Sequence, residues 1–336
     1  GAQGVAMLEN RELLYTIANL YYETGKNQQE ISNLLNLSRP MVSRALSRAR
    51  AMGIVRIEVI PPAGCSQLET NLAKALGIKR VVVGSSPDRN SNDRDDRIKA
   101  ISAAAGSYLS QTILPGMAVG VGWGVSVHRS ILALPECPHL KGVTVVPLVG
   151  SAGRTESHYQ VNVIADRMAE KLHGNALFFN IPAFVSDLKV QSFFSRDPQM
   201  KSIQDLWSRL DIAIVGLGAF GGTPSFPVGE YTLQALEELR QNGVVGDILG
   251  RFYNKEGFID DINADEQLIT RPMQDVEEKL YVGIPFESLR KTKQIVCVCG
   301  GTGKLEGIIT AAKLQLFDCL ITDALTATEL AASLEQ

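Results

Sequence analysis

Two glycine-rich turns hold the residues of this chain whose types and spacing best suit ligand chemistry. One spans residues 120–126 and the other residues 300–304, and each follows a predicted strand and precedes a predicted helix. Glycines let backbone N–H groups approach an anion such as a phosphate, and the amino end of a helix adds a favourable dipole. The alternative for each is an ordinary tight turn. We expect ligand contacts from Gly122, Trp123, Gly124 and Ser126 in the first turn and from Gly301, Thr302, Gly303 and Lys304 in the second.

Two segments resemble nucleotide-binding motifs, but each lacks a feature that nucleotide binding requires. A triphosphate-binding loop that contains Lys304 needs glycine at position 298 and Ser or Thr at position 305, where Val298 and Leu305 stand. Residues 216–221 match the dinucleotide spacing G-x-G-x-x-G, but Pro224 and Pro227 disfavour the helix that would hold a pyrophosphate. We therefore expect no nucleotide cofactor and interpret residues 216–221 as a loop that lines a pocket.

Five further polar residues are candidates for ligand recognition. Asp247 suits sugar hydroxyls and Arg251 suits a phosphate, whereas a helical segment would pair the two as an i,i+4 ion pair. Gln160 and Asn162 begin a predicted helix and Arg154 precedes it. These three residues either cap the helix or contact the ligand.

The sequence has no pattern typical of a catalytic or metal site. The histidines at positions 128, 139, 158 and 173 lack metal-ligand spacing, and no Ser–His–Asp or paired-carboxylate arrangement is present. The five cysteines include no C-x-x-C pair, so we expect no bound metal. Buried, reduced thiols in a cytosolic protein are the expected state of these residues.

Basic residues near the amino end indicate a different partner. Residues 38–51 have no acidic side chain and are apolar on one side, and they follow a short predicted helix that begins near residue 28. A helix that enters the DNA major groove needs such a cationic outer face and apolar inner face, whereas the alternative is a solvated helix. Residues 1–62 hold seven Lys/Arg and five Asp/Glu although the chain has a net charge of −3, so a polyanion is expected at this end only. We expect DNA contacts from Gln28, Ser38, Arg39, Ser43, Arg44, Arg48 and Arg50.

Turn signals and apolar spacing divide the chain into parts. Residues 7–60 predict a winged-helix-like helix-turn-helix domain whose last element is a strand over residues 54–60, and a linker follows over residues 61–77. Residues 78–334 alternate short apolar strands with helices, which predicts an α/β fold with a mostly parallel, doubly wound sheet. We expect Leu68, Leu72 and Leu76 of the linker to contact a second subunit. No apolar run is long enough to span a bilayer, and a cytoplasmic protein is expected.

Seven segments occur along the chain in an order typical of one protein family, namely LYYETGKNQQEISNLLNLSRPMVSRAL, VGVGWGVSV, VVPLVGSAG, YQVNVIADRMAEKL, DIAIVGLG, GDILGRF and VCVCGGTGKLEGIITAAKLQLFDCLITD. On these segments the sequence resembles the SorC (sorbose operon regulator) family of bacterial sugar-responsive regulators from about residue 13 to residue 330. Two positions differ from the family's usual pattern: Ser126 stands where Thr is common, and Glu306 stands where a small residue is usual.

The resemblance implies a regulator of a carbohydrate catabolic operon with three kinds of partner. These are operator DNA, a phosphorylated sugar effector, and further copies of the chain in a homo-dimer or homo-tetramer. It also implies an effector domain similar to glucosamine-6-phosphate deaminases and ribose-5-phosphate isomerases, with Asp247 in its pocket. The alternatives are a sugar-phosphate isomerase or deaminase-like enzyme with a fused DNA-binding head, and a kinase with such a head, which the missing Ser or Thr at position 305 disfavours.

Overall fold

The computed structural model describes residues 8–57, 66–86, 88, 90–153, 156–185, 187, 189–190, 196–220, 233–259, 269–270 and 280–335. The chain forms two compact units, residues 1–61 and residues 62–336. Each unit is built around hydrophobic clusters of its own. Among the helices described, none combines the length and apolar character needed to cross a membrane.

The smaller unit is a bundle of three helices, α2 (Arg11–Tyr22), α3 (Gln28–Leu35) and α4 (Arg39–Ala51). Leu14, Ile17, Ile31 and Val42 are fully buried between them. Removing these apolar side chains from water is the main driving force for so small a bundle.

Local signals determine where these helices begin and end. Asn27 and Glu30 form a capping box at the start of α3, and Asn36, with a left-handed φ of 51°, ends that helix. The Oγ atom of Ser38 accepts a hydrogen bond from the Met41 amide and caps α4. Two short helices joined by so short a turn form a helix-turn-helix.

The wing strand expected over residues 54–60 is not seen in the described part of the smaller unit. Residues 54–57 form turns and irregular backbone, and residues 58–60 lie outside the described residues. For residues 54–57 the apolar alternation therefore did not by itself predict a paired strand, because a strand also needs a partner for its backbone groups.

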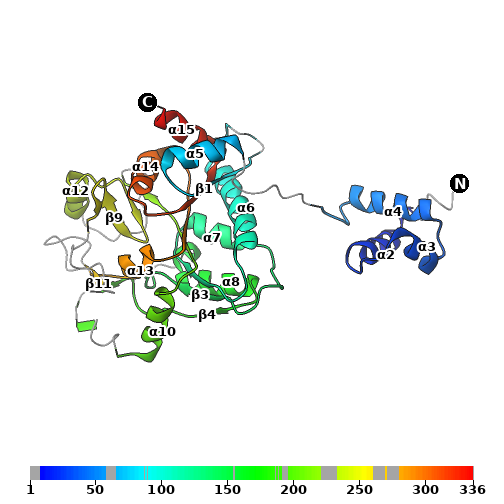
Figure 1. Cartoon of the computed structure of the whole chain (residues 1–336), viewed down its shortest axis with the longest axis horizontal. Helices are drawn as coiled ribbons and strands as arrows, with labels where there is room; N and C mark the ends of the chain where they lie inside the picture. The colour runs from blue at the N-terminus through cyan, green and yellow to red at the C-terminus, as the bar shows by residue number, and fades with distance from the viewer. Residues whose placement is uncertain are drawn as a thin grey trace. The chain divides into compact units, whose positions relative to one another are not determined.

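A parallel sheet of seven strands forms the centre of the larger unit (Figure 1), and this confirms the α/β, mostly parallel fold expected from the sequence. Its strand order is β1-β14-β13-β6-β2-β3-β4. The strands are β1 (Arg80–Gly84), β2 (Ala118–Val121), β3 (Thr144–Pro147), β4 (Asn175–Ala176), β6 (Ile212–Val215), β13 (Gln294–Val298) and β14 (Cys319–Asp323).

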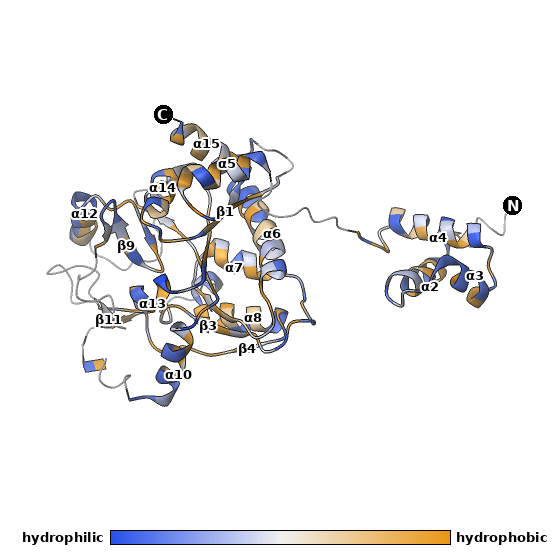
Figure 2. Cartoon of the chain, in the orientation of Figure 1, coloured by the Kyte–Doolittle hydropathy of each residue, from blue (hydrophilic) through white to orange (hydrophobic). Residues whose placement is uncertain are grey.

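Helices cover both faces of this sheet. Val81 and Ile295 pack on one side with α5, α10, α14 and α15, whereas their neighbours Val82 and Val296 pack on the other side with α6, α7 and α8. Side chains alternate between faces along a strand, so a strand covered on both sides must be apolar throughout. Figure 2 shows the matching apolar and polar stripes on the helices. The helices are α5 (Gln67–Leu76), α6 (Arg94–Thr112), α7 (Val125–Leu132), α8 (Val161–Lys171), α10 (Pro198–Trp207), α12 (Leu233–Gln241), α13 (Phe286–Arg290), α14 (Leu305–Lys313) and α15 (Ala324–Leu334).

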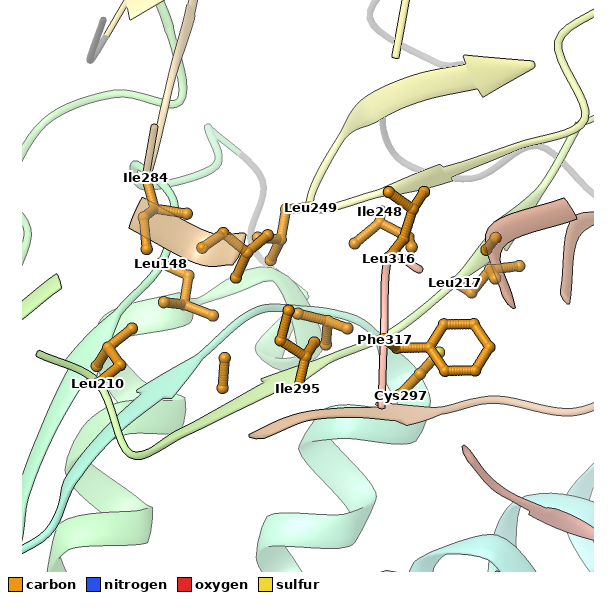
Figure 3. Packing of buried hydrophobic residues seen from close by; sticks show 14 of the residues in the cluster. Leu148, Leu210, Leu217, Ile248, Leu249, Ile284, Ile295, Cys297, Leu316 and Phe317 are labelled. Carbon is orange, nitrogen blue, oxygen red and sulfur yellow. The ribbon is translucent and has the colours of Figure 1, made fainter. Parts of the chain in front are cut away.

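Two small antiparallel sheets lie beside the parallel one. The first pairs β7 (Gly218–Ala219), β8 (Gly246–Ile248), β9 (Arg251–Asn254) and β10 (Gly257–Phe258), and the second pairs β5 (Phe184–Val185), β11 (Ile269–Thr270) and β12 (Leu280–Val282). Leu249 and Gly250 join β8 to β9 with φ values of 56° and 81°. Two positive φ angles in succession are typical of a tight hairpin turn. Figure 3 shows Leu249 in the packed cluster that also holds Leu148, Ile284 and Ile295.

The helix predicted within the linker is part of the larger unit. Leu72 and Leu76 of α5 are buried in the same cluster as the sheet, and the carboxylate of Glu69 accepts a hydrogen bond of 2.9 Å from the Val83 amide of β1. The expected role of Leu72 and Leu76 in contacts between subunits is therefore wrong. Leu68, at 36% exposure, keeps part of its surface accessible.

Candidate functional site

A cavity of about 560 Å³ opens at the carboxyl ends of the central strands β2, β6 and β13. The chain continues from β2 toward β3 and from β6 toward β13, so the strand order changes direction between β2 and β6. Open α/β sheets bind ligands at such a switch point. The cavity is of the size that small-molecule sites have.

The two glycine-rich turns and the segment 216–219, which ends in β7, line this one cavity. They are far apart in the sequence, and the parallel pairing of β2, β6 and β13 brings them together. Of the predicted ligand contacts, the cavity is lined by Trp123, Gly124, Ser126, Asp247, Gly301, Thr302, Gly303 and Lys304.

The first turn ends at the amino terminus of α7. Gly124 has a φ of 116°, donates its N–H to the carbonyl of His158 at 2.7 Å, and leaves α7 without a side-chain cap. The amides of the first helical turn, at Val125, Ser126 and Val127, have no intrahelical acceptors and form an uncapped anion site beside the cavity. Gly122 is not among the residues that line the cavity. A Cβ there would lie 2.5 Å from Leu249 Cδ2, so the glycine allows close packing against the hairpin.

The second turn is held by a short chain of hydrogen bonds. The Gly301 amide donates to Thr326 Oγ1 at 2.8 Å, and the Thr326 hydroxyl donates to the buried carboxylate of Asp323. The Lys304 ammonium donates to the carbonyl of Leu217 at 2.7 Å, which ties this turn to the loop after β6. Lys304 is therefore positioned at the cavity rather than extended into solvent.

Asp247 and Arg251 lie on two different strands in the structure. They belong to paired strands of the β8–β9 hairpin, so the helical i,i+4 ion pair considered from the sequence is wrong. Asp247 is buried at the cavity wall, where a Cβ on Gly218 would lie 2.2 Å from its Oδ1 atom. Arg251 is opposite Ile248 in register, and alternation along a strand directs its side chain to the other face. Its guanidinium lies 4.5 Å from the ring centre of Phe258, away from the cavity-lining residues.

Two of the remaining candidates, Gln160 and Asn162, are not among the described residues that line the cavity. Asn162 joins α8 to the segment after β4, because its amide accepts from the Phe179 N–H at 2.8 Å and donates to the Phe179 carbonyl at 3.2 Å. Gln160 is the residue before α8 and makes no side-chain cap there. Arg154 lies outside the described residues.

The structure adds cavity residues that the sequence did not reveal. Asn92, Arg94 and Arg97 come from the start of α6, and Tyr159 packs edge-on to Trp123 with ring centres 6.3 Å apart. Arg94 and Arg97 are one helical turn apart, a spacing that in sequence is typical of a solvated helix face. Three basic side chains thus line the cavity with the carboxylate of Asp247, which suits a ligand with an anionic group and hydroxyls.

The smaller unit presents a second candidate site on α4. Arg39, Ser43, Arg44, Arg48 and Arg50 are exposed on this helix, whereas its apolar residues are buried. At 3.6 residues per turn, Arg44 lies near the middle of the exposed surface, Ser43 lies toward one side of it, and Arg39 lies at that edge beside the buried Leu46. Ser38 caps the helix and Gln28 begins α3, so both candidates lie at helix amino ends. Such an arrangement fits a recognition helix in a DNA groove.

A helix-turn-helix with a basic second helix, on one chain with a ligand cavity in an α/β unit, defines a ligand-responsive DNA-binding regulator. Comparison with known proteins agrees with this class. A family model for a sugar-binding domain (Sugar-bind) matches residues 61–332. The sorbitol operon regulator of Klebsiella pneumoniae is 28% identical over 322 residues, covering 94% of this chain and 96% of the relative. The deoxyribonucleoside regulator of Bacillus subtilis is 27% identical over 330 residues, covering 96% and 98%.

Solved structures agree with this result. The crystal structure of the full-length sorbitol operon regulator from Klebsiella pneumoniae has a TM-score of 0.76 at 26% identity and covers 96% of this chain and 99% of that one. The chain belongs to the SorC family of transcriptional regulators with a sugar-binding domain. Because these relatives are regulators, the chain is a regulator and not the enzyme considered as the alternative.

Proposed function

We propose that this regulator binds operator DNA of a carbohydrate catabolic operon and that a phosphorylated sugar in the cavity controls that binding. The observation that carries the proposal is the convergence of both glycine-rich turns, Lys304 and Asp247 on one cavity at the switch point of the sheet. The named relatives include regulators of sorbitol and deoxyribonucleoside systems, which supports a sugar as the effector class.

The two ends of the proposed ligand have different partners. Backbone amides at the start of α7 and of residues 302–304, with the ammonium of Lys304, suit the phosphate. The carboxylate of Asp247 accepts hydrogen bonds and has no favourable interaction with a phosphate, so it suits sugar hydroxyls. A phosphorylated sugar satisfies both ends, whereas a bare phosphate or a free sugar satisfies only one.

The smaller unit is proposed to read DNA through α4. Arg39, Ser43 and Arg44 contact base edges, Arg48 and Arg50 contact phosphates, and Gln28 and Ser38 add contacts from helix amino ends. One helix-turn-helix reads few base pairs, so we propose a homo-dimer or homo-tetramer that places two such units on half-sites about one helical turn or a multiple apart. The proposed division is residues 7–60 for DNA and residues 78–334 for the effector, and within the intervening residues 61–77 the helix α5 packs on the effector unit. Bacterial chromosomal DNA lies in the cytoplasm, so we propose the cytoplasm as the location of this regulator.

Effector binding controls operator affinity only if the effector has different affinities for two arrangements of the oligomer. A tenfold change in operator affinity needs about 1.4 kcal/mol of such coupling.

Calorimetry with matched ligand pairs tests the effector. Sorbitol 6-phosphate and 2-deoxyribose 5-phosphate are compared with sorbitol and 2-deoxyribose, and operator binding is measured with and without each, on DNA selected from a random library. We expect one phosphate to bind at least tenfold more tightly than its parent and to change operator affinity. Equal affinity of phosphate and parent across a wider panel of sugars contradicts the proposal.

Substitution on α4 tests the DNA-reading surface. Arg44→Ala is expected to weaken specific operator binding by about 1–3 kcal/mol, because a bidentate base contact is lost. The control Arg11→Ala removes an exposed charge of α2 and is expected to keep specificity. An Arg39→Ala/Arg44→Ala double variant with normal operator affinity and specificity contradicts the assignment.

A further inference from the structure

Arg97 lies against the second glycine-rich turn although it comes from a helix about 200 residues earlier in the chain. A Cβ on Gly301 would be 3.5 Å from Cζ, 3.5 Å from Nε and 3.6 Å from Nη2 of Arg97. Three bonded atoms at nearly equal distances from one point place the guanidinium flat against the turn. Both residues line the cavity, so the cationic group of Arg97 is part of its wall.

The positive charge of Arg97 has no counter-charge among the ion pairs found in the described residues. Two of the acidic side chains that precede it, Asp93 and Asp96, are hydrogen-bonded to other groups. Asp93 Oδ1 accepts from the Asp95 and Asp96 amides, and Asp96 accepts from the Ser91 hydroxyl at 3.0 Å. A half-buried guanidinium without an acidic partner is costly unless an anion compensates it.

The stem of Arg97 is held in place by packing. A Cβ on Gly300 would lie 2.3 Å from Asp323 Oδ1, 2.7 Å from Ile101 Cδ1 and 3.3 Å from Arg97 Cδ, so Asp323 and α6 together leave no room for a side chain at position 300. The turn is itself anchored to Asp323 through Thr326. The guanidinium is therefore presented by two packed elements, which reduces the conformational entropy lost on ligand binding.

We propose that Arg97 is the second charged contact to the effector phosphate, which it binds from α6 while Lys304 and the turn 301–304 bind it from the sheet side. This rests on the proposed function, because it assumes a phosphorylated effector in this cavity. The planar fork of arginine binds phosphate with two hydrogen bonds, whereas lysine acts as a point charge. The pair thus selects a phosphate over a hydroxyl at this end of the ligand.

Three variants test the inference: Arg97→Met, Arg97→Lys, and the control Lys99→Met, which removes an exposed charge from the same helix outside the cavity. Calorimetry is run with sorbitol 6-phosphate, sorbitol and inorganic phosphate, and fluorescence of Trp123 at the cavity wall gives a second signal. Arg97→Met is expected to weaken phosphate-ester binding at least tenfold without changing affinity for the parent polyol. Arg97→Lys is expected to fall between Arg97→Met and the wild type, and Lys99→Met to match the wild type.

The outcomes separate the inference from the proposed function. If the wild type prefers the phosphate ester but Arg97→Met keeps the same preference, the inference is overturned and the proposed function stands. If the wild type shows no preference for the phosphate ester over its parent across the wider panel of sugars, both are overturned. Operator binding without effector reports whether each variant is folded. If Arg97→Met is not folded, Arg97→Lys provides the test.

Discussion

The parallel sheet has an amino edge, where its strands begin, and a carboxyl edge, where its strands end. These two edges use charged residues in opposite ways. At the amino edge, Asp211 accepts from the Ala118 amide of β2 at 2.9 Å and Asp318 accepts from the Ile295 amide of β13 at 2.8 Å. Lys293 pairs with Asp211, and Lys79 lies 3.9 Å from Asp318. The amino edge is thus closed by partners that the chain itself supplies.

At the carboxyl edge the basic groups face a cavity instead. Lys304 donates to a neutral carbonyl, Arg97 lies flat against a glycine turn, and α7 begins without a side-chain cap. Each arrangement leaves positive charge or amide dipoles uncompensated by a carboxylate. Charges of this fold are paired internally at the amino edge, where they serve stability, and they face the cavity at the carboxyl edge, where we propose that the effector supplies their partner.

The largest effect is expected at Lys304 of the carboxyl edge, and it is compared with the substitution of Lys293 at the amino edge. Lys304→Ala is expected to lower effector affinity at least tenfold and up to about a hundredfold, about 1.4–2.7 kcal/mol, because a charge-assisted contact to the phosphate is lost. Operator binding without effector is expected to stay intact. Calorimetry and operator titrations measure the two quantities.

Lys293→Ala is the matched variant at the amino edge, and it is expected to keep effector affinity. A normal effector response in Lys304→Ala, or a lost one in Lys293→Ala, contradicts the contrast between the edges. Lys313→Ala, in the last turn of α14, controls for simple loss of charge from the helix that follows Lys304.

An intermediate effect is expected from Asp211→Asn at the amino edge. Burial raises the pKa of Asp211, but the hydrogen bonds from Lys293 and the Ala118 amide outweigh it and hold the pKa below its ordinary value of 3.8. The substitution is expected to lower the free energy of unfolding by about 1–2 kcal/mol at pH 7, because a hydrogen-bonded charge is lost.

The pH dependence gives this prediction its sign. A carboxylate whose pKa is lowered by folding stabilises the protein above its ordinary pKa, and the stabilisation is lost as the pH falls through the lowered value. The difference in the free energy of unfolding between the wild type and Asp211→Asn, measured in urea, is therefore expected at neutral pH. We expect this difference to disappear in acid. A gap that grows in acid, or one matched by the exposed control Asp205→Asn, argues against a stabilising charge at this position.

The smallest effect is expected at Ser126, and it tests whether the turn before α7 contacts the effector through this hydroxyl. Ser126→Ala is expected to weaken effector binding about three- to tenfold, about 0.6–1.4 kcal/mol, because one neutral hydroxyl donor is lost while the helix amides remain. Ser130→Ala lies one turn further along α7, where the Ser130 hydroxyl donates to the Ser126 carbonyl at 2.6 Å. It is expected to lower thermal stability with unchanged effector affinity. Equal affinity losses in both variants would show that the helix, and not the Ser126 hydroxyl, is responsible.

Long-range pairing explains what sequence patterns missed. The segment around Asp247 was open to a helical interpretation because its i,i+4 charges satisfy a local rule. The structure shows a hairpin in which Leu249 packs into the core and Arg251 stacks on Phe258. Arg97 was missed for the related reason that a basic residue near a helix start indicates solvent unless its tertiary neighbours are known.

By itself, the sequence determined the features that depend on local chemistry. Capping residues such as Asn27 and Ser38 begin the helices of the DNA-binding unit, apolar runs form the central strands, and glycines form the turns after β2 and β13. Only the tertiary structure decided that both turns share one cavity, that α6 brings Arg97 to it, and that Leu72 and Leu76 are buried within their own unit. The physical reason is that capping and turn geometry involve neighbours within a few residues, whereas the cavity depends on which parallel strands pair and which helix faces they bury.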